Sequence, residues 1–186
     1  YLDERLTVSG TVRLDKNQNF NAVVSPAASV VWKPKPNNFL RASFSSALRN
    51  PTLADQYLNL NVGRAILAGN LNGVDSLITI ESFDRYRDSL DLNQLEYINI
   101  DAVRPEQVRT FELGYRTTLF NSLYVDASYY YSVYTSFLGF NIGVEATFDE
   151  ATGFPTDLQA YRYAANSRNN VTTQGFSIGL NYYFGD

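Results

Sequence analysis

The stretch FELGYRTTLFNSLYVDASYYYSV, residues 111–133, decides the fold class. Apolar and polar side chains alternate from Phe111 to Leu119 and again from Leu123 to Val133, and only three residues separate the two runs. Alternation with a period of two is typical of a β-strand whose two faces meet different surroundings. The stretch therefore predicts two antiparallel strands joined by a tight turn.

The length of this turn fixes which residues of the two strands lie opposite each other. Directly opposed residues of an antiparallel pair point to the same face, and Leu119 and Leu123 both belong to the apolar face. We therefore expect a three-residue turn with one residue in the left-handed region, which Asn121 tolerates well. The same register sets Glu112 opposite Tyr130. It also predicts an Arg116–Asp126 ion pair, worth about 0.2–1 kcal/mol if water reaches it.

Four further stretches show the same alternation: Leu6–Leu14, Ala28–Lys33, Phe39–Leu48 and Phe176–Phe184. With the two strands above, they predict six strands, which we expect to form one open antiparallel sheet in sequence order. Only Glu81–Leu90 has apolar residues at helical spacing, so we expect one helix there.

The connections between these strands alternate in length. Residues 34–38 and 120–122 are short, whereas Asn50–Arg104 and Asn141–Asn170 are long. A compact soluble domain rarely carries an irregular connection of some fifty residues, whereas short turns at one end and long loops at the other are typical of a transmembrane β-barrel. The fold class is therefore all-β, an antiparallel up-and-down transmembrane β-barrel segment of about six strands; a soluble β-sandwich is the alternative.

We make different predictions for the two long connections. Asn50–Arg104 is expected to be an irregular external loop that carries the helix. Asn141–Asn170 is expected to form a hairpin that continues the strands above the membrane and turns near Asp149–Gly153.

Composition excludes several kinds of chemistry. The 186 residues include no cysteine and no histidine, so disulfides, Cys/His zinc sites and Ser-His-Asp triads are excluded within the chain. A net charge of -4 without a basic stripe argues against nucleic acid as a partner. The acidic residues within Phe148–Pro155 lack the ligand spacing of a calcium loop, and no metal or cofactor is expected.

The faces of the predicted strands suggest which residues meet which surroundings. The apolar face is expected to meet lipid, with Trp32, Tyr182 and Phe184 as interface aromatics near the short turns. The polar face is expected to line the lumen or meet a plug, through Arg41, Glu112, Arg116, Asp126 and Tyr130. Candidates for substrate contact in the loops are Phe83, Tyr86, Arg87 and Tyr134. The alternative is that the charges satisfy one another and the aromatics pack the loop.

Two segments carry a resemblance to a known family. They are LRASFSSALRNPTLADQYLNLNVG, residues 40–63, and VRPEQVRTFELGYRTTLFNSLYVDASYYYSVYTSFLG, residues 103–139. These segments resemble the barrel of a TonB-dependent outer-membrane receptor. The motifs that carry the resemblance are, in order, a strand arginine, Arg49-x-Pro51, a long loop, Pro105-Glu106 and Phe111–Tyr115. Within that family the style is closest to receptors of the Bacteroidota.

The resemblance implies a bacterial outer-membrane importer rather than an enzyme. It implies a plugged barrel of about 22 strands, driven through TonB, that takes up a scarce substrate such as a siderophore, cobalamin, peptide or glycan. Residues 1–186 would belong to a single barrel domain. The family's plug, which contacts TonB, has no counterpart in this sequence, and we expect the parent polypeptide to continue beyond both ends. Membrane lipid and an outer-membrane lipoprotein or complex are further expected partners; a passive or structural barrel subunit is the alternative function.

Overall fold

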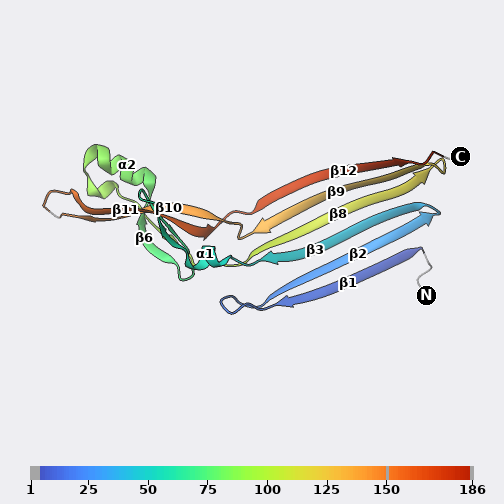
Figure 1. The fold of residues 1–186 in the computed structure, drawn as a ribbon, viewed down its shortest axis with the longest axis horizontal. Helices are drawn as coiled ribbons and strands as arrows, with labels where there is room; N and C mark the ends of the chain where they lie inside the picture. The colour runs from blue at the N-terminus through green and yellow to red at the C-terminus, as the bar shows by residue number, and fades with distance from the viewer. Residues whose placement is uncertain (1–4, 150, 185–186) are drawn as a thin grey trace. The chain divides into compact units, whose positions relative to one another are not determined.

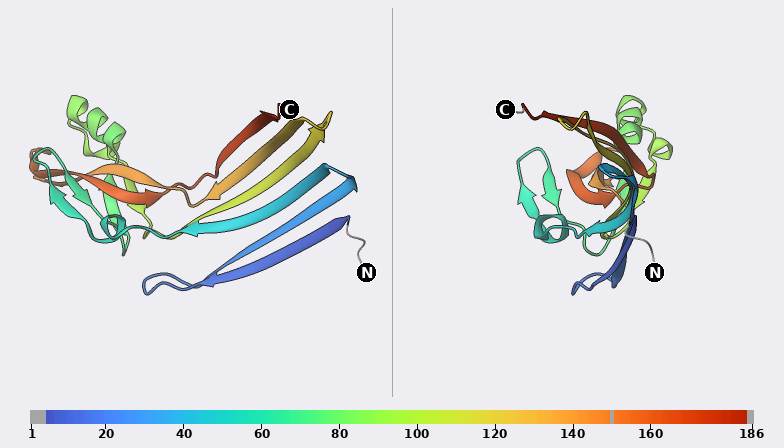
Figure 2. Two further views of the ribbon diagram at one scale, coloured as in Figure 1. Left: turned by 45° about the vertical axis from the view of Figure 1, so that its right-hand side comes forward. Right: turned by 90° about the vertical axis from the view of Figure 1, so that its right-hand side faces the viewer.

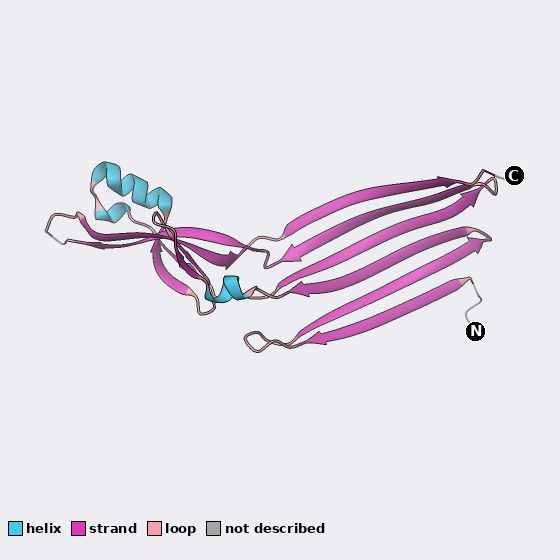
Figure 3. Cartoon of the chain, in the orientation of Figure 1, coloured by secondary structure: helices cyan, strands magenta, loops and turns pink. Residues whose placement is uncertain are grey.

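The computed structural model of the protein describes residues 5–149 and 151–184, and the chain divides into two compact units. The first unit consists of a segment that ends at Arg49, the segment Gln107–Thr135 and a segment that begins at Asn169. The second unit consists of Asn50–Glu106 and Ser136–Arg168. The first unit is built from strands, and the helices of the described residues all lie in the second (Figure 1, Figure 3).

The first unit is a six-stranded sheet in the order β1-β2-β3-β8-β9-β12. Its strands are β1 (Leu6–Asp15), β2 (Val23–Lys35), β3 (Asn38–Arg49), β8 (Glu106–Leu119), β9 (Leu123–Thr135) and β12 (Val171–Tyr182). The strands follow one another across the sheet in chain order and β1 is not paired with β12, so the predicted open up-and-down sheet is confirmed (Figure 2).

The tight turn between β8 and β9 has the predicted length and register. Leu119 lies opposite Leu123, and Arg116 lies opposite Asp126. Two turn residues rather than one are left-handed, because Phe120 has φ 52° as well as Asn121 with φ 59°. The Ser122 amide donates to the Leu119 carbonyl at 3.1 Å. The turn therefore combines two left-handed central residues, whose twist matches that of the strands, with one extra residue that preserves the faces.

One face of this sheet is apolar from edge to edge. Phe176, Tyr129 and Leu113 lie side by side across β12, β9 and β8. This apolar band continues from β8 to β3, because the ring of Phe111 on β8 lies 5.0 Å from the ring of Phe44 on β3. Along β8 the band runs from Phe111 to Leu119, which is about 27 Å at the rise of a strand. Its large side chains remain exposed, so this face has no cover within the described part of the chain.

The second unit contains a sheet in the order β4-β5-β11-β10-β6-β7. Its elements are α1 (Leu53–Tyr57), β4 (Asn59–Asn61), β5 (Ile66–Ala68), β6 (Val74–Ile78), α2 (Ile80–Ser89), the 3-10 helix η1 (Leu92–Gln94), β7 (Tyr97–Ile100), β10 (Leu138–Phe148) and β11 (Pro155–Asn166). The strands β10 and β11 form the predicted hairpin, and Gly153 in its turn is left-handed with φ 71°. Glu150, also in the predicted turn, lies outside the described residues.

The expectation that residues 50–104 are irregular apart from one helix is wrong. The predicted helix is present as α2, but four short strands of the same segment pair within the second sheet. Two of them, β5 and β6, flank the β10–β11 hairpin on its two sides. Pairing with a hairpin distant in sequence, rather than local periodicity, makes these segments strands.

Side chains from both segments of the second unit form its core. Leu77, Ile100 and Ala165 are buried together. Tyr86 of α2 is 2% exposed, and its hydroxyl donates to the Gly153 carbonyl while its ring meets Phe148 edge-on at 5.1 Å. The second unit is thus a folded body. In the described part of the chain, no helix has the length and apolar content needed to cross a membrane.

Candidate functional site

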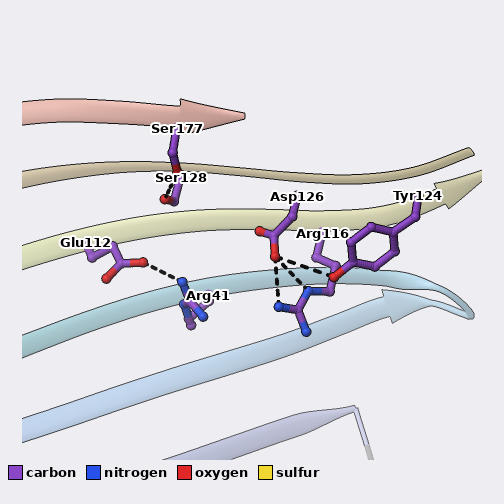
Figure 4. Close-up of polar contacts among 7 residues, drawn as sticks. All are labelled: Arg41, Glu112, Arg116, Tyr124, Asp126, Ser128 and Ser177. Atoms are coloured by element: carbon purple, nitrogen blue, oxygen red, sulfur yellow. Dashed lines mark hydrogen bonds and ion pairs between the residues drawn. The ribbon is translucent and has the colours of Figure 1, made fainter. Parts of the chain in front are cut away.

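Two of the predicted charged residues form an ion pair on the polar face of the six-stranded sheet. Arg41 of β3 donates from Nη2 to Oε1 of Glu112 on β8 (Figure 4). The guanidinium reaches Glu112 across Gly114, since a Cβ at that glycine would lie 3.4 Å from Arg41 Nε and Nη2. The absence of a side chain at Gly114 thus leaves room for the guanidinium beside that residue.

A second pair lies on the same face, between β8 and β9. Arg116 Nη2 donates to Asp126 Oδ2 at 2.8 Å, and Arg116 Nε donates to the same oxygen at 3.2 Å. The Tyr124 ring lies 5.8 Å from the guanidinium, and its hydroxyl is 3.5 Å from Asp126 Oδ2 (Figure 4). The predicted Arg116–Asp126 pair is therefore confirmed. Its side chains are 50% and 34% exposed, so the pair contributes only about 0.2–1 kcal/mol.

The same face continues onto β12 through small residues. Ser128 and Ser177 form a hydrogen bond of 2.9 Å between their hydroxyl oxygens (Figure 4). The Tyr130 ring lies over Gly175, because a Cβ there would stand 2.8 Å from Tyr130 Cε1. Of the predicted polar-face residues, the structure thus brings Arg41 to Glu112 and Arg116 to Asp126. Tyr130 lies opposite Glu112, as predicted, and its ring lies over Gly175 of the next strand.

These pairings determine what the polar face can do electrostatically. Each of the two arginines has a carboxylate partner, so the four ionised groups cancel within the sheet. These two pairs offer hydrogen bonds and hydration without a local excess of charge of one sign. They suit a water-filled or protein-filled space better than selective binding of a charged molecule.

The three predicted interface aromatics lie toward the tight-turn end of the strands. Trp32 is in the last part of β2 and opposite Leu40 of β3. The Tyr182 and Phe184 rings meet edge-on at 4.8 Å at the end of β12. The three side chains thus lie at the same end of the sheet, although β2 and β12 are not neighbours in it.

The loop residues proposed from sequence are divided between the two units. Tyr86 is buried, and Phe83 lies beside it with ring centroids 5.7 Å apart. Arg87 is exposed on α2 and pairs with Asp84 at 3.1 Å. Tyr134 lies in β9, in the first unit, opposite Val108 and Val171.

A cavity of about 430 Å³ in the second unit was not predicted from sequence. Its lining includes Ile98, Asp101, Arg104, Phe137, Gly139 and Arg168. These residues stand at the ends of strands or just outside them, so no single stretch displays the set. The available signal was that Arg104 and Arg168 both fall shortly before a strand that enters the first unit. No group of three or more potential metal ligands is present among the residues that the structure describes.

A family model for the TonB-dependent receptor-like β-barrel matches residues 1–185. The chain belongs to the TonB-dependent receptor β-barrel family. Proteins of this family are transporters of the bacterial outer membrane rather than enzymes, and typical members take up siderophores or haem. The exposed apolar band of the sheet is consistent with that location.

Solved structures of receptors share the fold of this TonB-dependent receptor chain. The siderophore receptor PirA from Acinetobacter baumannii matches with a TM-score of 0.61 and 15% identity, over 100% of this chain and 24% of that protein. PirA from Pseudomonas aeruginosa matches with a TM-score of 0.60 and 15% identity, over 96% and 28%. A double mutant of the Serratia marcescens hemophore receptor HasR, in complex with HasA and heme, matches with a TM-score of 0.55 and 12% identity, over 95% and 27%.

The chain therefore spans about a quarter of the length of these receptors. At these identities the likeness concerns the fold alone. Among curated proteins, no sequence match was found.

Proposed function

We propose that this chain forms part of the barrel wall and the extracellular loops of an active nutrient importer. One observation carries the proposal: a six-stranded sheet has one face of uncovered apolar side chains and another of paired charges, and its long connections fold as a separate unit. A barrel that separates lipid from an aqueous lumen needs such a two-faced sheet, and uptake of a scarce molecule needs a folded receptor surface.

In this proposal the apolar face meets lipid. The band from Phe111 to Leu119 is about 27 Å along the strand, and a tilt of about 40° reduces its height to about 21 Å. The apolar band of outer-membrane barrels is about 25 Å tall. Trp32, Tyr182 and Phe184 then belong to the aromatic girdle at the tight-turn side of the membrane.

The polar face lines the lumen or meets a plug domain. Arg41, Glu112, Arg116, Asp126 and Tyr130 are the residues on that side of the sheet. Their mutual pairing supports a role in holding the wall and its hydration rather than in selecting the substrate. The plug, and TonB through it, are proposed partners of this chain, which would be part of a single barrel domain.

The second unit is the proposed substrate-facing region. Phe83 and Arg87 lie on α2 within it, whereas Tyr86 is committed to the core of the unit. The substrate class stays open between siderophore, haem, cobalamin, peptide and glycan. An outer-membrane lipoprotein partner and an origin in the Bacteroidota also remain predictions.

The test compares the growth of a strain that lacks this receptor with the growth of the same strain after the receptor gene is restored. Each medium makes one such nutrient limiting. Active import predicts a growth defect on one nutrient that complementation corrects and that deletion of TonB reproduces. The second candidate, a passive or structural barrel, predicts no TonB-dependent growth difference, combined with a change in outer-membrane permeability to small antibiotics.

A further inference from the structure

The cavity of the second unit has a lining with a net positive charge. Arg104 and Arg168 are among its lining residues, together with Asp101. Within the described part of the chain, neither arginine side chain makes an ion pair or a hydrogen bond. Other arginines of the same unit do pair, as Arg85 does with Glu96 at 2.6 Å. Two arginines that line one cavity therefore have guanidinium groups available to bind an oxyanion.

The wall that carries Asp101 and Arg104 is held by two asparagine side chains. Asn70 is 2% exposed and donates from Nδ2 to the carbonyls of Asp101 at 2.8 Å and Ala164 at 3.0 Å. Asn166 accepts from the Arg104 amide at 2.9 Å and donates to the Arg104 carbonyl at 2.9 Å. Because the backbone on both sides of the cavity is fixed in this way, binding would require ordering of the side chains alone.

A small residue in the lining leaves space in the cavity. Gly139 of β10 is opposite Ala165 of β11, and a Cβ at Gly139 would meet no atom within 4 Å. Apolar surface beside this space comes from Ile98 and Phe137. The volume of about 430 Å³ falls within the range of ligand pockets, about 300–1,000 Å³.

We propose that this cavity binds a small oxyanion that also carries an apolar or aromatic group. The carboxylate or phenolate oxygens would be bound by Arg104 and Arg168, and the ring would lie against Phe137 and Ile98. Asp101 would accept a hydrogen bond from a hydroxyl of the same molecule. This inference rests on the proposed importer function, of which it names the substrate class.

Salicylate is a suitable probe, since it combines a carboxylate, an aromatic ring and a hydroxyl. Salicylamide is its uncharged control of nearly the same shape. Binding of both would be measured by saturation-transfer NMR on the receptor that carries this chain, purified in detergent. We expect salicylate to bind about tenfold more tightly than salicylamide, because only the carboxylate can form charge-assisted hydrogen bonds with the arginines.

Three variants locate the binding. Arg104→Gln and Arg168→Gln should each weaken salicylate binding about tenfold or more and leave salicylamide unaffected. Gly139→Leu should abolish binding of both probes, because its side chain fills the cavity without backbone strain. Arg64→Gln, at an exposed arginine of the same unit outside the cavity, should change neither.

Equal binding of salicylate and salicylamide would overturn the proposal, and so would salicylate binding that survives Gly139→Leu. These outcomes are separate from the fate of the importer proposal. Anion binding without any TonB-dependent growth would support the anion site and contradict the importer proposal. TonB-dependent growth without anion binding would support the importer proposal and contradict the anion site.

Discussion

The assignment of the apolar face to lipid is tested at two adjacent residues of β12 that point to opposite faces. Ile178 lies opposite Ala127, which in turn lies opposite Tyr115. Tyr115 is the midpoint of the band from Phe111 to Leu119, about 10 Å from its end when the strand tilt is included. Ile178→Arg therefore places a charge near the centre of the membrane. Gly179→Arg places the same charge on the polar face.

The two variants should differ strongly in stability. An arginine on the lipid face near the midplane costs about 2–4 kcal/mol, which is roughly a 30- to 900-fold change in the folding equilibrium. At Gly179 the new side chain meets open space, with Asp126 O the nearest atom at 3.8 Å from the added Cβ. Gly179 also lies opposite Asp126, so an arginine there could share the carboxylate that already pairs with Arg116.

The measurement is equilibrium unfolding of the receptor in phospholipid vesicles, followed by tryptophan fluorescence and by heat-modifiable mobility on gels. We expect the Ile178→Arg variant to unfold at lower denaturant concentration and Gly179→Arg to remain within about 1 kcal/mol of the parent. The reasoning is refuted if the two variants are equally stable, or if Gly179→Arg is the more damaging change.

Three further predictions follow from single contacts. A double-mutant cycle on the Arg116–Asp126 pair should give a coupling of about 1 kcal/mol or less, since both side chains are partly exposed; a value above 2 kcal/mol would indicate a dry environment. Gly175→Ala should displace the Tyr130 ring, which is 41% exposed, and destabilise the barrel by about 1 kcal/mol or less, whereas Gly10→Ala, with only Ala27 O at 3.9 Å, should leave stability unchanged in the same unfolding assay. Hydrogen bonds from the Thr152 hydroxyl and amide lower the pKa of Asp149, so the hairpin turn should keep its stability above the ordinary carboxyl pKa and lose it as the pH falls through the lowered value. The measurement is the chemical shift of the Thr152 amide in an NMR pH titration. A titration midpoint at or above the ordinary carboxyl pKa would contradict the prediction.

The first unit could be predicted because its determinants are local. Strands of ten to fourteen residues give several periods of alternation, so element type and face are both fixed by neighbours in the chain. Parity and turn length then sufficed to pair Arg116 with Asp126. The partner of Arg41 could not be found in this way, because the whole segment between β3 and β8 separates it from Glu112.

The second left-handed residue of the turn was missed for a different reason. Residue preference favours Asn121 over Phe120 in that conformation. The structure nevertheless places Phe120 there, with its side chain 90% exposed. The geometry needed to continue the strand twist outweighs the local preference of one residue.

The second unit could not be predicted because its pairing is not local. The strands β4 and β5 have three residues each, too few to display a period. The β5–β11 pair is also parallel, so no short turn in the sequence indicates that the two strands are neighbours. No single stretch of sequence predicts the cavity of this unit, because its lining comes from strand ends in both segments.

The shared sheet has a consequence for how the second unit can move. The β10–β11 hairpin lies between β5 and β6, so the two long connections of the chain are hydrogen-bonded into one body. Asn70 adds to this, because it joins the first connection to Ala164 of β11. Neither connection can open alone without breaking ladder hydrogen bonds and exposing buried residues such as Leu77. Any response of this region to a bound substrate should therefore be a movement of the whole unit, and deletion of either connection should unfold the other.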